Sequence, residues 1–334
     1  MIRRTAHRPR TVPIHRYRRA SDVAVNCNHS NNRSITSEQR ASSANEERRT
    51  RNSCIHRHWP IRNGINLFVR EEAKLSLSLP SIMTPTFLDV CDTYNNRLVT
   101  YGTDGGFQQV YTAISETGEV RFHHPYAVHI DSDNRLYLID QSERRIKVFN
   151  RDFKLIRVIG QYGREVGQYS APCDLCTSEQ NHIFVCDAGG HRVLKYNEQG
   201  QFLLAWGGLG TDNGQFKCPA CVCILRGDRI AVSDWGNDRI QVFNTDGDHL
   251  SSIGQRGKLL GEFSRPLGLA YDEAGERLFV CDEGNNRVYI FNRDFTVTEL
   301  VHSKVGFHGP YDILLLKEGR MMISEHRAHR LQII

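Results

Sequence analysis

The stretch Val-Cys-Asp-Glu-Gly-Asn-Asn-Arg-Val-Tyr-Ile-Phe at residues 280–291 contains the pattern that decides the fold. An acid is followed five positions later by an arginine, and a short apolar run lies on each side of the pair. The same pair occurs six times along the chain: Asp92/Arg97, Asp140/Arg145, Asp187/Arg192, Asp234/Arg239, Asp282/Arg287 and Glu325/Arg330. Successive acids are 48, 47, 47, 48 and 43 residues apart. So constant a period identifies a repeat protein.

Each repeat predicts four short strands. An apolar run ends at the acid, and an alternating run such as Arg239-Ile-Gln-Val-Phe243 begins at the arginine. Period-two apolar spacing with β-branched and aromatic residues indicates strands. A turn rich in Asn, Asp and Gly leads to a third apolar run. A fourth apolar run begins at a proline, with an aromatic residue three positions before it: Phe122/Pro125, Tyr169/Pro172, Phe216/Pro219, Phe263/Pro266 and Phe307/Pro310. We therefore predict an all-β fold, a six-bladed β-propeller of four-stranded antiparallel blades.

The repeats place the propeller at residues 64–334 and leave residues 1–60 as a tail. The sixth repeat ends without a run for its outer strand. We therefore predict that an N-terminal strand at 65–70 crosses over to close blade six, which would leave no open sheet edge. The run that follows, at 74–79, is the expected innermost strand of blade one.

Charge separates the tail from the propeller. Residues 1–60 hold 13 Arg, no Lys and 4 acids, a net +9, whereas the whole chain carries +5, so residues 61–334 carry −4. A segment rich in Arg, Ser and Asn with few hydrophobic residues predicts a disordered basic tail. No apolar run is long enough to span a membrane and no secretory core is present, so we expect a cytoplasmic protein without a membrane partner. The arginine-rich first residues leave a mitochondrial presequence as an alternative.

The block at 280–291, with Gly-Glu-Phe-Ser-Arg-Pro at 261–266 ahead of it, resembles the NHL repeat. The resemblance covers residues 64–334. It implies a six-bladed NHL propeller, similar to the C-terminal domain of tripartite-motif NHL proteins and of related RING-type ubiquitin ligases. The first repeat departs by lacking the aromatic residue and proline that open the others, and the sixth by using Glu325. Terminal repeats are commonly atypical.

Ten cysteines in a chain without a secretory signal predict reduced thiols. Cys91, Cys186 and Cys281 share one position before the aspartate and are expected to be small buried residues. The pairs Cys173/Cys176 and Cys218/Cys221 look like zinc knuckles, but residues three apart on a strand point to opposite faces. We expect no metal and no cofactor. The tail has only Cys27 and Cys54, so the chain has no RING framework for ubiquitin transfer.

The acid–arginine pairs are predicted to be structural turn clamps. A catalytic centre is built once from different residues, whereas this pair recurs in every repeat. We expect the acid to cap the turn between the second and third strands by accepting backbone N–H bonds. The arginine is expected to reach a neighbouring carboxylate or carbonyl.

Residues that differ between the repeats are the candidates for binding. The four positions inside each pair, and the loops leading to each proline, are expected to form one rim of the propeller. Exposed aromatic and basic side chains suit stacking on bases or anchoring a peptide. The binding-surface candidates are Tyr94, Arg144, His191, Lys217, Trp235, Arg256, Lys258, Asn285 and Arg327.

Three functions fit these residues. The first is a non-enzymatic protein–protein interaction scaffold, which the resemblance connects with substrate recognition in a ubiquitin-ligase pathway. The second is RNA binding in post-transcriptional regulation, through the rim or the basic tail, although the net charge of residues 61–334 disfavours general phosphate binding. The third is a zinc lyase or hydrolase in the central channel, to which the inward strands contribute His129 and little else. We expect a protein partner and no enzymatic activity.

Overall fold

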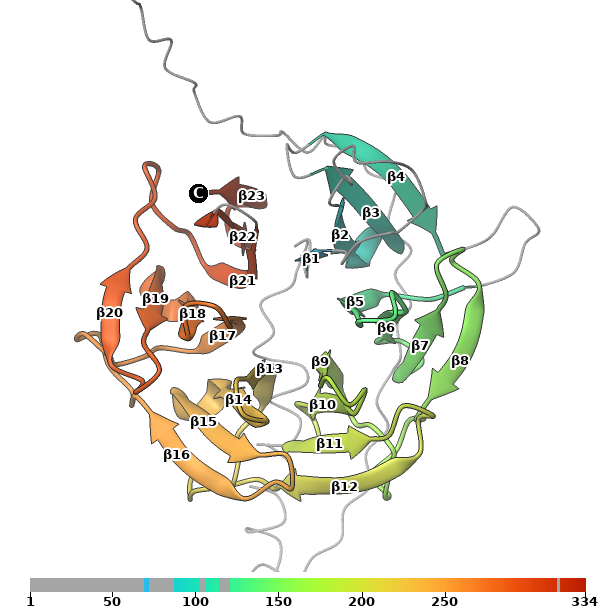
Figure 1. The fold of residues 1–334 in the computed structure, drawn as a ribbon, viewed down its shortest axis with the longest axis horizontal. Helices are drawn as coiled ribbons and strands as arrows, with labels where there is room; N and C mark the ends of the chain where they lie inside the picture. The colour runs from blue at the N-terminus through green and yellow to red at the C-terminus, as the bar shows by residue number, and fades with distance from the viewer. Residues whose placement is uncertain (1–68, 72–86, 103–105, 114–120, 317–318) are drawn as a thin grey trace, which may run out of the picture. The chain divides into compact units, whose positions relative to one another are not determined.

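The computed structural model describes residues 69–71, 87–102, 106–113, 121–316 and 319–334. These residues form six antiparallel sheets arranged as the blades of a β-propeller around a central channel (Figure 1). The predicted fold is therefore confirmed. The predicted tail at 1–60 lies outside the described residues. In the described part of the chain, no helix is long and apolar enough to cross a membrane.

Five blades contain four described strands each, and the sixth contains three. Blade one comprises β1 (Val69–Glu71), β2 (Phe87–Asp92), β3 (Arg97–Gly102) and β4 (Phe107–Thr112). Blade two comprises β5 (Pro125–Ile130), β6 (Leu136–Asp140), β7 (Arg145–Phe149) and β8 (Leu155–Ile159). Blade three comprises β9 (Pro172–Thr177), β10 (Ile183–Asp187), β11 (Arg192–Tyr196) and β12 (Phe202–Gly207).

The second half of the ring follows the same order. Blade four comprises β13 (Pro219–Leu225), β14 (Arg229–Asp234), β15 (Arg239–Asn244) and β16 (His249–Ile253). Blade five comprises β17 (Pro266–Asp272), β18 (Arg277–Asp282), β19 (Arg287–Phe291) and β20 (Val297–Leu300). Blade six comprises β21 (Pro310–Leu315), β22 (Met321–Glu325) and β23 (Arg330–Ile333). Short 3₁₀ turns follow three of the acids: η1 (Thr93–Asn95), η2 (Trp235–Asn237) and η3 (Glu283–Asn285).

Position within the blade explains the pattern of side chains on each strand. Strands β1, β5, β9, β13, β17 and β21 surround the channel, and β4, β8, β12, β16 and β20 lie at the periphery (Figure 1). The second strands β6 and β10 are buried along their whole length because a neighbouring blade packs on each face. The peripheral strand β12 alternates between half-buried and exposed residues, as expected when one face meets solvent.

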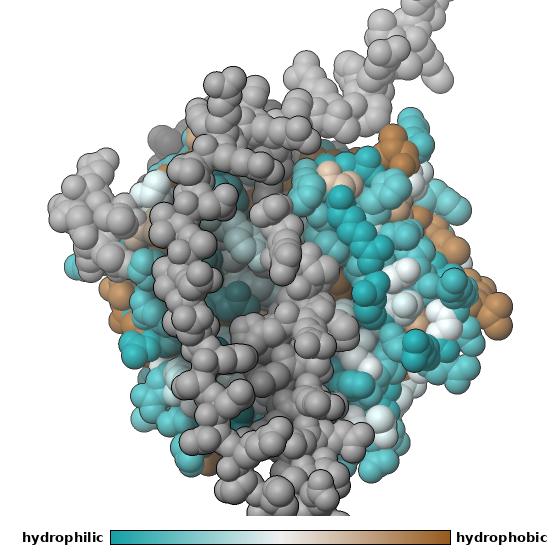
Figure 2. Space-filling model, turned by 180° about the vertical axis from the view of Figure 1, so that it is seen from behind, coloured by the Kyte–Doolittle hydropathy of each residue, from teal (hydrophilic) through white to brown (hydrophobic). Residues whose placement is uncertain are grey.

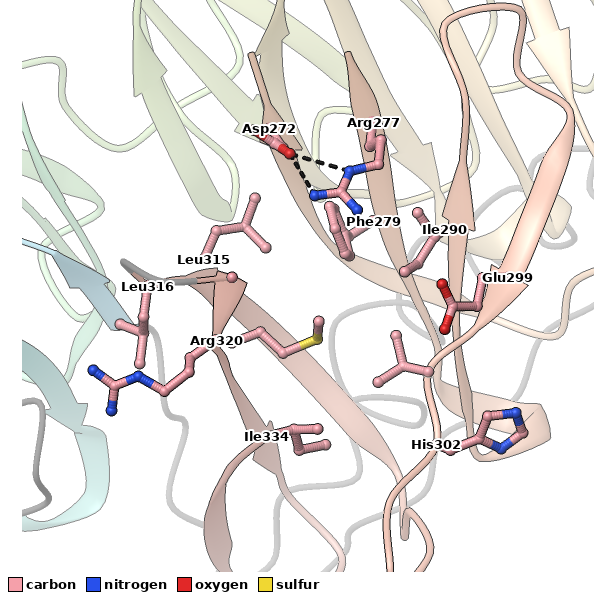
Figure 3. A pocket seen from close by; sticks show the side chains of 13 residues that line it. Asp272, Arg277, Phe279, Ile290, Glu299, His302, Leu315, Leu316, Arg320 and Ile334 are labelled. Carbon is pink, nitrogen blue, oxygen red and sulfur yellow. Dashed lines mark hydrogen bonds and ion pairs between the residues drawn. The ribbon is translucent and has the colours of Figure 1, made fainter. Parts of the chain in front are cut away.

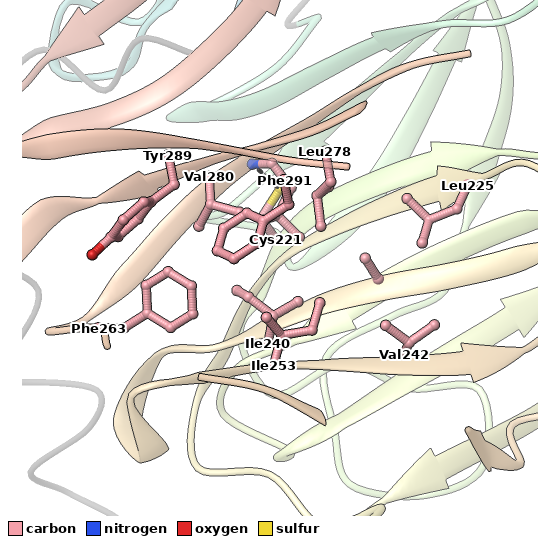
Figure 4. Close-up of a cluster of buried hydrophobic side chains, with 12 residues drawn as sticks. Cys221, Leu225, Ile240, Val242, Ile253, Phe263, Leu278, Val280, Tyr289 and Phe291 are labelled. Carbon is pink, nitrogen blue, oxygen red and sulfur yellow. Dashed lines mark hydrogen bonds between the residues drawn. The ribbon is translucent and has the colours of Figure 1, made fainter. Parts of the chain in front are cut away.

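Apolar side chains from adjacent blades hold the ring together. Between blades four and five, Ile240 and Ile253 pack with Phe263, Val280 and Phe291 (Figure 4). The aromatic residues that precede each proline belong to this packing, since all of them are buried: Phe122, Tyr169, Phe216, Phe263 and Phe307. The predicted buried positions Cys91, Cys186 and Cys281 are fully buried as well. The repeated apolar residues are thus the interface between blades.

One predicted strand is wrong. We predicted that residues 65–70 close blade six, but Val69 and Arg70 belong to β1, which pairs antiparallel with β2 of blade one. Val69 lies opposite Val90, so β1 is the innermost strand of its own blade. The physical reason is that β2 needs a partner on its channel side, and β1 supplies the backbone groups. Residues 65–68 and the run at 74–79 lie outside the described residues.

Candidate functional site

One rim of the propeller carries the acid–arginine turns together with the loops that lead from a peripheral strand into the next innermost strand. We call this side the clamp rim. Both sets of loops meet here because the second strand ends, and the first strand begins, at the same edge of the blade. All the predicted clamps and binding candidates of the described residues lie on this rim or next to it.

In blades two to six, the acid binds the loop that enters its own blade. The carboxylate of Asp234 accepts a hydrogen bond from the N–H of Lys217 at 2.7 Å, and Asp282 accepts one from Ser264 at 2.7 Å. The donor is the residue two positions before the proline, and the same contact recurs in other blades: Ser170 to Asp187, His123 to Asp140 and His308 to Glu325. Burial raises the pKa of the carboxyls of Asp234 and Asp282, which these donors and the arginines oppose.

This contact corrects the predicted position of the cap. The acids were expected to cap the turn that follows them, but no side-chain cap bond is present at η1, η2 or η3. A cap within the turn occurs in blade two, where the N–H of Glu143 donates to Asp140 at 3.0 Å. The carboxylate is aimed back at the entry loop because its strand pairs directly with the proline strand, as Asp234 does with Pro219.

The arginines complete the clamp. Nε of Arg239 lies 2.9 Å from Asp234, and Nη2 donates to the carbonyl of Gln215 at 3.0 Å. The planar guanidinium thus joins the acid and the entry loop at the same time. The same carboxylate contact is present at Arg97, Arg192, Arg287 and Arg330.

Within the described ranges, blade two lacks the ion pair between acid and arginine that the other blades have. Lys147 lies 2.9 Å from Asp140 and takes the position of the cation, while Arg145 is exposed. In the described residues no ion pair joins Arg145 to Asp140. Lys147 points to the clamp because it stands two positions after the arginine, as do Gln241 and Gln332 in their blades, whose amides also donate to the acid. The prediction that Arg145 is a clamp is therefore wrong.

A second set of hydrogen bonds joins neighbouring blades. At four blade boundaries, the residue before the arginine has a positive φ and accepts a bond from the N–H of the residue before the next proline. Asn286 binds Gly309 at 2.7 Å, Asp238 binds Arg265 at 2.7 Å, and Asn96 binds His124 at 2.8 Å. His191 does the same for Cys218 through Nδ1 at 3.0 Å.

Two of the predicted binding candidates make structural hydrogen bonds. His191 is 6% exposed and serves as an acceptor between blades three and four. Asn285 is half-buried and donates to Asp282 at 2.8 Å and to the carbonyl of Gly257 at 2.9 Å. Their position in the repeat contained this information, because asparagine or aspartate fills the equivalent places in other blades.

The remaining candidates line the clamp rim at different depths. Tyr94 is exposed and lies edge-on to His124, and the Arg144 guanidinium lies 4.1 Å from the centre of the Tyr162 ring. Trp235 is half-buried at the start of η2. The side chain of Arg256 is 89% exposed, Arg327 is 40% exposed, and Lys217 and Lys258 are exposed.

Aliphatic side chains were absent from the predicted candidates, yet several are exposed in the rim loops. Val166 is 74% exposed, Leu259 is 72% exposed and Leu260 is 67% exposed. Further exposed apolar residues of these loops are Tyr162, Leu209 and Val305. In Figure 2, the described residues of one face are mostly hydrophilic, and hydrophobic ones gather towards the periphery. The loop at 254–265 could have been singled out, because it places two leucines where the equivalent loop at 207–218 has aspartate and asparagine.

A buried charge cluster lies at the inner edge of the clamp rim, between blades five and six. Glu283 is 2% exposed and pairs with Arg265 at 3.0 Å and with Arg327. His326 of blade six faces the same carboxylate, with Nε2 3.5 Å from Oε1. Burial raises the pKa of Glu283, and the two arginines oppose that effect. Burial lowers the pKa of His326 to about 4.

Structural contacts join the innermost strands around the central channel. The hydroxyls of Tyr126 and Tyr311 meet at 2.8 Å. Asp174 accepts a bond from the N–H of Val222 in the next blade at 2.9 Å. In the described part of the chain, no group of three or more His, Cys, Asp or Glu side chains is arranged to hold a metal ion. Burial raises the pKa of the thiols at Cys91, Cys186, Cys221 and Cys281.

Two cavities lie away from the clamp rim. One, of about 280 Å³, is at the opposite end of the channel, where His129 Nε2 lies 2.7 Å from the Thr177 hydroxyl. The other, of about 520 Å³, lies between blades five and six (Figure 3). Its wall contains the ion pair of Asp272 and Arg277 at 2.7 Å above apolar side chains. Neither cavity contains a predicted binding candidate.

The ring of antiparallel blades defines the class of this protein as a six-bladed β-propeller. Residues 113–205 and 210–304 match the family described as 6-bladed beta-propeller, and these segments make up more than half of the chain. The chain belongs to this family. No curated protein matches the sequence.

Solved structures show the same fold. A catalytically inactive virginiamycin B lyase from Staphylococcus aureus, solved with quinupristin, is 12% identical, with a TM-score of 0.57 over 82% of each chain. A protein of unknown function from Bacteroides thetaiotaomicron is 17% identical, with a TM-score of 0.58 over 82% of this chain and 70% of that one. A gluconolactonase from Xanthomonas campestris is 17% identical, with a TM-score of 0.53 over 74% and 81%. These identities establish the fold and no activity.

Proposed function

We propose that the protein is a non-enzymatic interaction scaffold that binds a partner protein on the clamp rim. The observation that carries the proposal is the exposure of Leu259 and Leu260 beside the exposed cations Arg256 and Lys258. These four residues form what we call the blade-five loop. Exposed apolar residues rimmed by charge mark interaction sites.

The loop is rigid enough to present these side chains. The N–H of Leu259 donates to the Glu262 carboxylate at 2.9 Å, and the Leu259 carbonyl accepts from Arg287 at 2.9 Å. The backbone is therefore bound to the clamp while the leucine side chains face outward. A preorganised apolar surface loses less conformational entropy when it binds.

Charge specifies the chemistry of the partner. Around the blade-five loop the exposed side chains of Arg256 and Lys258 are basic, whereas Glu262 is occupied by main-chain N–H groups. An extended partner segment with apolar residues and acidic neighbours would complement this surface. The resemblance to tripartite-motif NHL proteins suggests substrate recruitment in a cytoplasmic ubiquitin-ligase pathway as the setting.

RNA is less well supported by the same residues. Nonspecific phosphate binding needs clustered basic groups, and the predicted base-stacking residue Trp235 is half-buried. An enzyme in the channel would need a converging set of catalytic groups. In the part of the chain that the structure describes, no three His, Cys, Asp or Glu side chains converge to hold a metal ion.

A peptide-display selection tests the proposal. Random peptides are selected against the full chain and against a Leu259→Ser/Leu260→Ser variant, with Leu155→Ser/Ile156→Ser as the matched control. The control replaces exposed apolar residues on the peripheral strand β8. We expect enrichment of acidic, apolar peptides whose affinity falls about tenfold or more in the loop variant and is unchanged in the control.

Other outcomes would reject the proposal. Peptides that bind the loop variant as well as the unmodified chain would place the interaction elsewhere. Submicromolar binding of a random single-stranded RNA pool, with a steep salt slope and no peptide enrichment, would favour RNA. The melting temperature of each variant is measured first, so that unfolding is not read as lost binding.

A further inference from the structure

We propose that Arg265, Arg327 and His326 form a recognition site for an acidic residue of the partner, at the inner edge of the clamp rim between blades five and six. The inference rests on the proposed function, because it names the group that the docked segment would place there. The site lies where the strands β17 and β21 begin, and both arginines are 40% exposed.

The cluster has an excess of positive charge. Glu283 is the acid that both arginines contact, through Arg265 Nη2 at 3.0 Å and through Arg327 Nη2. His326 is neutral at physiological pH, so two guanidiniums share one carboxylate. Asp282 is near but pairs with Arg287 at 2.9 Å. One further negative charge would balance the cluster, and two arginines match a carboxylate geometrically.

The cluster also has an unfilled acceptor. His326 Nδ1 lies 3.1 Å from the carbonyl of Gly309, so this nitrogen carries the ring proton. Nε2 is then an acceptor, and it is buried without a hydrogen-bond partner in a residue that is 8% exposed. The group that it faces is the Glu283 carboxylate at 3.5 Å, which is another acceptor. Such a buried acceptor is costly unless a donor reaches it.

Gly309 lets the side chains of His326 and Arg327 pack closely against the main chain. A Cβ atom at this position would lie 2.8 Å from His326 Cε1 and 2.9 Å from Arg327 Cγ. The equivalent positions before the proline hold side chains in blades four and five, namely Cys218 and Arg265. Blade six therefore has no side chain at this position beside its histidine and arginine.

These features fit one kind of ligand. An acidic residue in a peptide offers a carboxylate for the arginines and an N–H donor close by for His326 Nε2. Insertion would require Arg327 to turn partly away from Glu283, which its exposure permits. The apolar residues next to the acid would then extend towards the leucines of the blade-five loop, which precedes Arg265 in the chain.

A small probe tests the site separately from the whole interaction. The full chain, labelled with ¹⁵N in its histidine rings, is titrated with N-acetyl-aspartate methylamide and with the asparagine analogue. The His326 signals are assigned with a His326→Gln variant. We expect saturable shifts of these signals with the aspartate compound and none with the asparagine compound. Arg265→Gln and Arg327→Gln should remove the response, and Arg293→Gln, at an exposed cation in the turn between β19 and β20, should keep it.

The outcomes separate this inference from the proposed function. If selected peptides bind the blade-five loop but their affinity changes less than twofold in Arg327→Gln, the proposed carboxylate recognition site is wrong and the scaffold proposal stands. If the aspartate probe shifts His326 but no peptide is enriched, the site stands and the scaffold proposal fails. Equal shifts with the asparagine compound would overturn the recognition of charge. If Arg327→Gln is too unstable to titrate, Arg327→Lys is used instead. Lysine retains the charge without the planar guanidinium, so this variant should keep part of the His326 response.

Discussion

His191 Nδ1 accepts a hydrogen bond from the main-chain N–H of Cys218 at 3.0 Å and so joins blade three to blade four. Asn96, Asp238 and Asn286 do the same at other blade boundaries. A residue that looks like a variable surface histidine in the sequence is therefore part of the repeat. Its left-handed backbone, with φ of 55°, is a conformation that asparagine tolerates well.

His191→Ala should destabilise the protein by about 1–3 kcal/mol, because the buried N–H of Cys218 loses its acceptor. His191→Asn should recover most of this stability, since its amide oxygen can replace Nδ1. Chemical denaturation of the full chain measures both. Equal losses in the two variants would show that ring packing, and not the hydrogen bond, is what His191 contributes.

Lys147→Met should lower the free energy of unfolding by roughly 3 kcal/mol, because it leaves the fully buried Asp140 without a cation. Arg145→Met is the matched control and should change it by less than about 0.5 kcal/mol, as expected for an exposed side chain. A larger loss of stability in Arg145→Met than in Lys147→Met would support the original prediction that Arg145 is the clamp residue of blade two.

The stability of the protein should fall as the pH drops through the range set by His326. Burial lowers its pKa in the folded state to about 4, below its ordinary value, so the unfolded chain binds the proton more readily. Its contribution is complete above about pH 6.5 and is lost progressively towards pH 4. Glu283, whose pKa is raised, acts in the opposite direction, and Arg265, Arg327 and His329 are the charges nearby.

His326→Gln should therefore flatten the curve of melting temperature against pH between 6.5 and 4 relative to the unmodified chain. His302→Gln, at an exposed position in the same blade region, is the control and should leave the slope unchanged. A parallel curve for His326→Gln would mean that this histidine does not titrate differently in the folded and unfolded states.

The buried thiols should resist alkylation in the folded protein. Burial raises the pKa of Cys186, Cys221 and Cys281, which removes the reactive thiolate, whereas Cys223 is half-buried. With iodoacetamide at pH 8, Cys223 should react at least about tenfold faster than these three, as mapped by mass spectrometry. Denatured protein should label uniformly, and fast labelling of Cys281 in folded protein would contradict its structural role.

The sequence by itself determined the number of blades, the strands of the repeats apart from the innermost strand of blade one, and the buried aromatic residues. These follow from local alternation and a fixed period, which any chain segment displays before it folds. Sequence also placed Arg192, Arg239 and Arg287 in one repeated role. The role could be predicted because the same contact recurs in several blades, so a residue's position within the repeat indicates which contact it makes.

Tertiary structure decided which residue makes each contact. Val69 pairs in blade one because β2 lacked a strand on its channel side, and sequence distance alone does not specify a strand partner. Lys147 takes the place of Arg145 at Asp140, and which of the two cations reaches the carboxylate depends on side-chain geometry. The cluster of Glu283, Arg265, Arg327 and His326 joins two blades, so no single repeat contains it. The candidate site therefore became visible only when the blades were placed side by side.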